Sequence, residues 1–293
     1  MTTSVKDRPL RDRSRAQKTL GLIANLALRE IKSQYNRTVL GRLWSLLNPL
    51  ATIAVFSLIF GLVFRGAAHE GLQSGVNSFP LWIATGVITW GFISGSISGG
   101  MNAFISNSAL LTKVYFPRWV LVISSTIAAV VQFASELLVI MVIMAIASGS
   151  LYVFLMILPL VLLVLLTAVF TTGIGLLLAI GVVYFRDIQH LWGIFNQVWM
   201  YASGVVFPLA MLEDVQVRLF DAGWQLGGQP LPLVTIFRLN PAEQFLEAYR
   251  ALLYDFVLPD WTVLVSCVLW AAAALGLGAL VYSRHYHRLV EEL

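Results

Sequence analysis

The chain of 293 residues has little charge and a single cysteine. Charged residues make up 12% of it and hydrophobic residues 58%, and the mean hydropathy is +0.81. Soluble domains carry about a quarter charged residues, so this composition excludes a water-soluble protein. The lone Cys267 excludes an intramolecular disulfide framework, and its apolar surroundings indicate a small packing residue.

Motifs for catalysis are also missing. No lysine follows a glycine, so the chain has no P-loop to hold nucleotide phosphates, and it has no GxSxG nucleophile elbow. The four histidines (His69, His190, His285 and His287) lie in expected loops or near the C-terminus, without the further ligands that zinc needs. We therefore expect no catalytic residue, metal or cofactor in this chain.

Six apolar runs are each long enough to cross about 30 Å of hydrocarbon as a helix. They lie near residues 46–64, 81–105, 120–147, 151–183, 191–211 and 262–282. The sequence thus predicts an all-α integral membrane fold with six transmembrane helices. Residues 46–282 would form the transmembrane domain, between an N-terminal segment (1–45) and a tail (283–293).

The positive residues are distributed unevenly between the two sides of this arrangement. Of the 19 Lys and Arg residues, 15 fall on the side of the two termini, and only Arg65, Arg218, Arg238 and Arg250 fall on the other. The positive-inside rule then places both termini in the cytoplasm. Because the basic residues flank the expected spans, anionic lipid headgroups are the expected partner of the net charge of +4, and nucleic acid is not.

The segment before the first span has a helical period. Its apolar residues recur at three- and four-residue spacing, with Arg29 and Lys32 on the opposite face, which predicts an amphipathic interfacial helix. Docking of a partner is a second role compatible with it. The apolar positions are Leu20, Ile23, Ala24, Ala27, Leu28, Ile31 and Tyr35.

The loop between the fifth and sixth spans is too apolar for an external loop in water. Asn240, Pro241 and Glu243 fit the N-cap, first and third positions of a helix, which predicts a helix over 241–253. That helix is too short to span a bilayer. We expect a re-entrant helical pair that dips into the outer leaflet against the other helices.

Two features inside the spans leave alternatives open. Gly91, Gly95 and Gly99 form two small-xxx-small steps that permit close helix packing, within or between protomers, or line a pathway. Glu136 is the only carboxylate well inside a span, and it fits a structural hydrogen bond or a proton relay.

Aromatic residues near the ends of the second and fifth spans also have two interpretations. Anchoring at the membrane interface is one, and stacking on the sugar rings of a moving substrate is the other. These residues are Trp90, Phe92, Trp192, Phe195, Trp199 and Tyr201.

The run QYNRTVLGRLWSLLNPLATIAVFSLIFGLVF at 34–64 resembles the start of ABC type-2 permeases, particularly the branch that exports O-antigen, teichoic acid and other lipid-linked polysaccharides. VYFPR at 114–118, YFRDIQH at 184–190 and LNPAEQFLEAYR at 239–250 support the resemblance. The positions that match the LGxLWxLLxP turn of the branch are Leu40, Gly41, Leu43, Trp44, Leu46, Leu47 and Pro49.

The resemblance implies a permease subunit that moves a lipid-linked polysaccharide across the bacterial cytoplasmic membrane as a homodimer. A separate ABC ATPase subunit would bind ATP and Mg, and the first, second and fifth spans would line the channel, with the six aromatic residues as candidates. Segment 107–119 would couple to the ATPase, unless it is an ordinary positively charged loop. The coupling candidates are Leu111, Lys113, Tyr115, Phe116 and Arg118, and the external gate candidates are Asn240, Pro241, Phe245, Tyr249 and Arg250.

Two other functions remain compatible with the sequence. One is a drug-exporting permease of the same family. The other is a membrane-embedded glycosyltransferase or acyltransferase, for which residues 186–190, including Asp187, form the only suggestive cluster.

Overall fold

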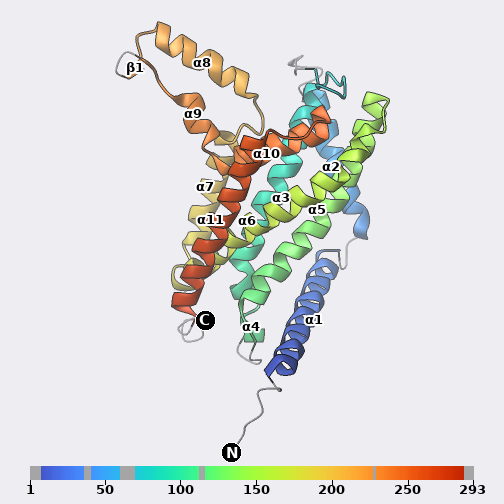
Figure 1. Cartoon of the computed structure of the whole chain (residues 1–293), viewed down its shortest axis with the longest axis vertical. Coiled ribbons are helices and arrows are strands. Elements are labelled where there is room, and N and C mark those ends of the chain that lie inside the picture. Colours follow the sequence, from blue (N-terminus) through green and yellow to red (C-terminus); the bar gives the residue numbers. More distant parts are fainter. Residues whose placement is uncertain (1–7, 36–40, 60–69, 112–115, 227–228, 287–293) are drawn as a thin grey trace, which may run out of the picture.

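The computed structural model describes residues 8–35, 41–59, 70–111, 116–226 and 229–286. Its long helices lie side by side, with α1 (Arg8–Tyr35) at one end of the bundle and α8 (Leu209–Asp221) projecting beyond the other end (Figure 1). Apart from β1 (Gln225–Leu226) and β2 (Gln229–Pro230), which pair antiparallel, the regular elements of the described part are helical. The expected all-α class is confirmed in this coarse form.

Within the described residues, four helical segments are long and apolar enough to cross a membrane. They match the second, third, fourth and sixth expected spans, and they are α3 (Phe79–Ser106), α5 (Trp119–Ser148), α6 (Ile157–Tyr184) with the preceding turn from Tyr152, and α11 (Trp261–His285). Pro80 stands in the first turn of α3, where no backbone N–H is needed, and Gly149 ends α5 at a φ of +65°. The sequence therefore fixes these boundaries locally.

The other two expected spans are shorter in the structure. In place of the first, α2 covers Trp44–Phe56, and the apolar helical stretch extends to Ile59, next to residues that lie outside the described part. In place of the fifth, α7 covers Ile188–Ala202, so a continuous helix over 191–211 was the wrong prediction. Gly204 has a φ of +65°, and Pro208 precedes α8 in an extended conformation. These two residues break the helix.

Two pairs of glycines bring the spans close together. A Cβ on Gly100 of α3 would lie 3.1 Å from the Cα of Gly175 of α6. On the other side of α6, a Cβ on Gly278 of α11 would meet the backbone of Gly173, and α6 and α11 make the most extensive helix pair. Close approach through small residues is the usual packing mode of membrane helices.

The N-terminal helix packs on the protein along part of its length. Ile23 and Leu26 are buried in a cluster with residues of α3, α5 and α6, and Ala27 is also buried, whereas Leu20 and Leu28 are exposed. Arg29 donates a hydrogen bond to Asn107 at the end of α3. The expected apolar stripe thus exists, but it is divided between this packing and the surface.

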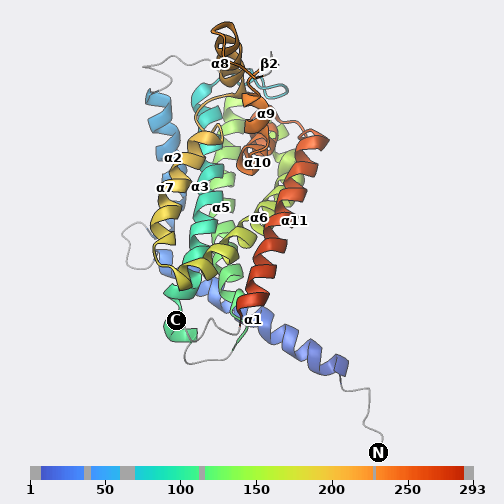
Figure 2. The same ribbon diagram turned by 90° about the vertical axis from the view of Figure 1, so that its left-hand side faces the viewer.

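The segment from Ser203 to Asp260 caps the end of the bundle that is opposite α1 (Figure 2). It contains α8, the two strands, α9 (Leu233–Arg238) and α10 (Pro241–Arg250), followed by a π-helical turn over Ala251–Asp255. Almost all of α10 is buried against α3, α6 and α11. This places α10 where it can organise a site between the helix ends.

Candidate functional site

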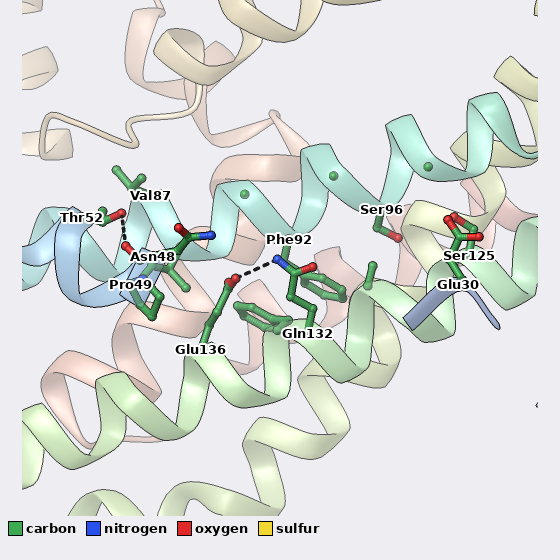
Figure 3. Close-up of a pocket in the computed structure, with 16 residues that line it drawn as sticks. Glu30, Asn48, Pro49, Thr52, Val87, Phe92, Ser96, Ser125, Gln132 and Glu136 are labelled. Carbon is green, nitrogen blue, oxygen red and sulfur yellow. Dashed lines mark hydrogen bonds between the residues drawn. The ribbon is translucent and has the colours of Figure 1, made fainter. Parts of the chain in front are cut away.

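A cavity of about 400 Å³ lies between α2, α3 and α5, with Glu30 of α1 also in its wall (Figure 3). We call it the glycine cavity. Its size falls within the usual range for ligand sites, about 300 to 1,000 Å³. Besides Glu30, it is lined by Asn48, Pro49, Thr52, Val87, Ile88, Gly91, Phe92, Gly95, Ser96, Gly99, Ser125, Ala129, Gln132, Phe133 and Glu136.

The glycine stripe of α3 faces this cavity. A Cβ added to Gly91 or Gly95 would meet no atom within 4 Å, and one added to Gly99 would meet the Ser125 hydroxyl at 2.6 Å. Among the described residues of this protomer, no helix packs closely on Gly91 or Gly95, and packing between protomers stays a prediction. Their missing side chains leave room in front of α3.

Glu136 lies in the wall of the cavity, where it accepts a side-chain hydrogen bond. Gln132, one turn earlier on α5, donates a hydrogen bond of 3.1 Å to its Oε1. Figure 3 places Glu136 and Glu30 toward opposite ends of the cavity. The hydrogen bond from Gln132 supports the structural role, and the proton relay stays a prediction.

A second cavity, of about 530 Å³, lies between the start of α3, the turn after α7, α9, α10 and the segment before α11. We call it the arginine cavity, because Arg250 organises it. Its lining residues are Leu72, Trp82, Ser203, Gly204, Phe207, Pro208, Leu209, Phe237, Glu243, Glu247, Arg250, Ala251, Asp255, Val257, Leu258, Pro259, Asp260 and Val263.

The guanidinium of Arg250 is held by three different groups. It donates hydrogen bonds to the carbonyl oxygens of Gly204 (3.0 Å) and Val205 (2.8 Å), and it lies 3.5 Å above the ring of Trp82. Gly86 makes room for it, since a Cβ there would meet the guanidinium directly. The Arg250 Nε is buried without a hydrogen-bond partner. Burial lowers the pKa of Arg250 to about 9, so it remains charged at neutral pH.

Carboxylates surround this cation. Glu243 is buried on α10 and accepts a hydrogen bond of 2.9 Å from Gln244. Burial, followed by the charge of Glu247, raises the pKa of Glu243 to about 7. The predicted helix start at Asn240 is confirmed here, and the side chain of Glu243 bonds to Gln244.

The expected gate residues are part of the rigid structure of α10. Asn240 caps the helix by accepting from the amide of Ala242 (3.0 Å), and it also accepts from the indole of Trp199 (2.8 Å). Tyr249 shares a hydrogen bond of 3.2 Å with Thr167. Phe245 is buried against Phe170, and Pro241 is the first helical residue. These contacts hold α10 against its neighbours, and the role of its residues as an external gate stays a prediction.

The six aromatic candidates differ in how far their side chains are exposed. Trp90, Phe92 and Trp192 are buried, and Phe92 stacks on Phe133 with a centroid distance of 4.3 Å. Trp199 is half-buried, with its ring 5.4 Å from that of Trp90. Phe195 and Tyr201 are each 53% exposed on α7. Only these two present large faces outside the protomer, although Phe92 also reaches the glycine cavity.

The coupling candidates that the structure describes turn inward. Phe116 and Arg118 are buried and Leu111 is half-buried, while Lys113 and Tyr115 lie outside the described residues. Arg118 donates a hydrogen bond of 2.7 Å to the carbonyl oxygen of Tyr286 and lies 5.1 Å from the centre of that ring. It therefore ties segment 107–119 to the end of α11.

The sequence missed the residues that hold Arg250 in place. Trp82 and Gly86 come from α3, whereas Gly204 and Val205 come from the turn after α7. No motif marks them, because their common feature is contact with Arg250. Within the described part, no cluster of three His, Cys, Asp or Glu residues is arranged for a metal.

Comparisons with known proteins agree with the resemblance noted from the sequence. The family model described as ABC-2 type transporter matches residues 22–221. The chain is 30% identical over 262 residues to an O-antigen export system permease protein of Myxococcus xanthus, across 87% of this chain and 91% of that protein. It is 23% identical to a protein of the same description from Klebsiella pneumoniae, across 66% and 71%.

A third similar protein carries a different name. The chain is 26% identical over 186 residues to a polysialic acid transport protein of Escherichia coli, across 63% of this chain and 69% of that protein. The family model covers more than half of the chain, and the first relative is similar over nearly its whole length. The chain therefore belongs to the ABC-2 type transporter family.

Proposed function

We propose that this chain is the transmembrane permease subunit of an ABC exporter that moves a lipid-linked polysaccharide across the bacterial cytoplasmic membrane. The observation that carries the proposal is the similarity to an O-antigen export permease over 87% of the chain. The four long apolar helices and the polar glycine cavity fit a transport subunit. ATP and Mg would be bound by a separate ATPase subunit.

The finer topology belongs to the same proposal. α2, with the apolar residues after it, and α7 would complete six spans, and both termini would be cytoplasmic. The basic N-terminal segment supports this orientation. α9 and α10 would then form the re-entrant pair on the outer side, which is supported by the burial of α10 among the helix ends.

A homodimer would bury the exposed face of α7. Large apolar side chains are exposed along this helix, and a second copy of the chain would cover them and form a channel from both protomers. They are Leu191, Ile194, Phe195, Val198 and Tyr201. In that channel Phe195 and Tyr201 are the aromatic residues best placed to contact sugar rings.

Segment 107–119 would receive the movement of the ATPase. Its two ends are tied to other helices, by Arg29 to Asn107 and by Arg118 to Tyr286. A displacement of the segment would thus reach α1 and α11 together. Arg118 would act as a positioning residue that transmits movement inside the permease.

Export can be tested in a strain in which this chain is deleted. The lipid-linked polysaccharide should accumulate in the inner leaflet and disappear from the cell surface, and the intact chain should restore it. An unchanged surface polysaccharide would contradict the proposal. ATP turnover of the purified complex that responds to hydrophobic drugs and not to lipid-linked glycan would favour the drug-exporting alternative.

The coupling role of Arg118 needs a variant that retains the charge. Arg118→Lys should lose the two-point contact with Tyr286 and reduce glycan-stimulated ATP turnover by about fivefold, because the planar fork of arginine is lost. Basal ATP turnover should stay within about twofold of the intact complex. Unchanged stimulation would contradict the positioning role.

A further inference from the structure

The arginine cavity contains carboxylate groups that accept hydrogen bonds. The Nη atoms of Arg250 donate to the carbonyls of Gly204 and Val205, and its Nε is buried, so the guanidinium is held by the protein itself. Glu247 and Asp260 are exposed carboxylates that accept hydrogen bonds from donors. A hydroxyl or ammonium group of a ligand donates such hydrogen bonds.

Apolar surface lies beside these groups. The rings of Phe207 and Phe237 line the same cavity with their centroids 5.8 Å apart. A sugar unit combines hydroxyls at its edge with C–H groups on its faces, and aromatic rings bind such faces. The volume of about 530 Å³ is also in the range of ordinary small-molecule sites.

The charge of the cavity restricts its ligand further. Four carboxylates (Glu243, Glu247, Asp255 and Asp260) and one guanidinium line it. The guanidinium faces two backbone carbonyls and the Trp82 ring, so it is not arranged to pair with an anion. An anionic sugar would face like charges, which costs binding free energy.

We propose that the arginine cavity binds uncharged or amino-substituted sugar units of the exported glycan and rejects acidic ones. This inference rests on the proposed function, since it names the substrate class of the same exporter. The ligand is recognised by its hydroxyl or ammonium groups through the carboxylates, and by its C–H faces through Phe207 and Phe237. The cavity would thus select against polyanionic chains.

Binding of three trisaccharides to the full chain in nanodiscs tests this. The probes are maltotriose, which is uncharged, the glucosamine trimer, which is cationic, and the sialic acid trimer, which is anionic. Saturation-transfer NMR titrations at pH 7.5 should give dissociation constants for the first two at least about tenfold lower than for the third. Equal binding of all three, or binding of none, would overturn the proposal.

Two variants test whether the preference between the trisaccharides arises in the arginine cavity. The double variant Glu243→Gln/Glu247→Gln should narrow the preference to about threefold or less, because it removes two of the four like charges. Glu213→Gln, on the exposed face of α8 and outside the cavity, should keep the full preference. If the double variant keeps the full preference between the trisaccharides, that preference arises outside the arginine cavity, and the proposal is contradicted.

Two further measurements separate this inference from the proposed function. The helical circular dichroism of the double variant establishes that it is folded. If the trisaccharides are discriminated but the deletion strain still exports its polysaccharide, the proposed function fails while the sugar site stands. If export is lost in that strain but no trisaccharide binds, the sugar site fails while the function stands.

Discussion

The two cavities of this permease use glycines of the same helix in opposite ways. Gly86 of α3 leaves space that the guanidinium of Arg250 fills, whereas Gly91 and Gly95, on the same helix, leave space that no other atom of the described chain fills. In the arginine cavity the missing side chain permits a tight, polar contact. In the glycine cavity the missing side chains leave a volume of about 400 Å³ open next to the polar residues of α5.

The difference shows that a glycine motif in a membrane helix does not by itself indicate packing. Gly100 and Gly175 do pack backbone to backbone, as the small-residue rule predicts. Gly91 and Gly95 follow the same spacing without a partner helix. What separates them is the position of α2 and α5, which is a property of the tertiary structure.

A matched pair of alanine substitutions should produce the largest contrast. In Gly86→Ala the new Cβ would meet the guanidinium of Arg250 and lie 2.9 Å from the Val205 carbonyl oxygen, so stability should fall by about 1–3 kcal/mol. In Gly91→Ala the Cβ meets nothing, and stability should stay level or rise slightly, because alanine favours the helix. Melting temperatures in detergent measure both, and equal losses would remove the distinction.

A change in pH should have a smaller effect on the stability of the protein, and this effect should arise at the arginine cavity. The folded chain holds the proton of Glu243 up to about pH 7, whereas the ordinary pKa is 4.5. The unfolded chain loses that proton earlier, so the free energy of unfolding should fall by ~1–2 kcal/mol as the pH rises through this window, and level off above it. The charged or titratable groups nearby are Glu247 and Arg250 of α10, Arg238 of α9 and Cys267 of α11.

Melting curves between pH 4.5 and 8 measure this slope. Glu243→Gln cannot titrate and should flatten it, while Glu213→Gln on the exposed α8 should leave it as in the intact chain. Stability that rises with pH over the window would contradict the assignment of the proton to Glu243.

The cap of α10 should contribute about 1 kcal/mol to the stability of the wall of the arginine cavity. Asn240→Ala removes the acceptor for Ala242 and Trp199, together with the donor to the Ala202 carbonyl oxygen (2.9 Å). Asn240→Asp retains the acceptor and should lose about half as much. Thermal melts of the two variants compare them, and an equal loss would show that the amide donor dominates.

The sequence predicted the long helices because their signals are local. A long apolar run marks both α3 and α5, a proline starts α3 and a glycine ends α5, and the start of α10 at Asn240 has the same local character. The end of α7 at Ala202 was missed because apolar residues continue through the break. Hydropathy alone does not reveal a glycine turn inside an apolar run.

The arginine cavity could not be predicted, because its contacts join residues that are far apart in the sequence. Arg250 meets Trp82 and the carbonyls of Gly204 and Val205, which are between 45 and 168 residues away in the chain. Such contacts follow from how α3, α7 and α10 pack. Similarly, Arg118 looks like a surface residue in sequence, but the end of α11 covers it.

The smallest change in stability, with the clearest consequence for transport, should come from filling the glycine cavity. Gly95→Leu extends into space where even a Cβ has no neighbour within 4 Å, so the melting temperature should change by no more than about 2 °C. If glycan passes along this face, surface polysaccharide should fall about tenfold, because the side chain occupies much of the cavity. Ala273→Leu, exposed on α11 and outside both cavities, is the matched control. A folded Gly95→Leu chain with full export would leave the open glycines of α3 without a role in transport, and the contrast between the two cavities would then be one of packing alone.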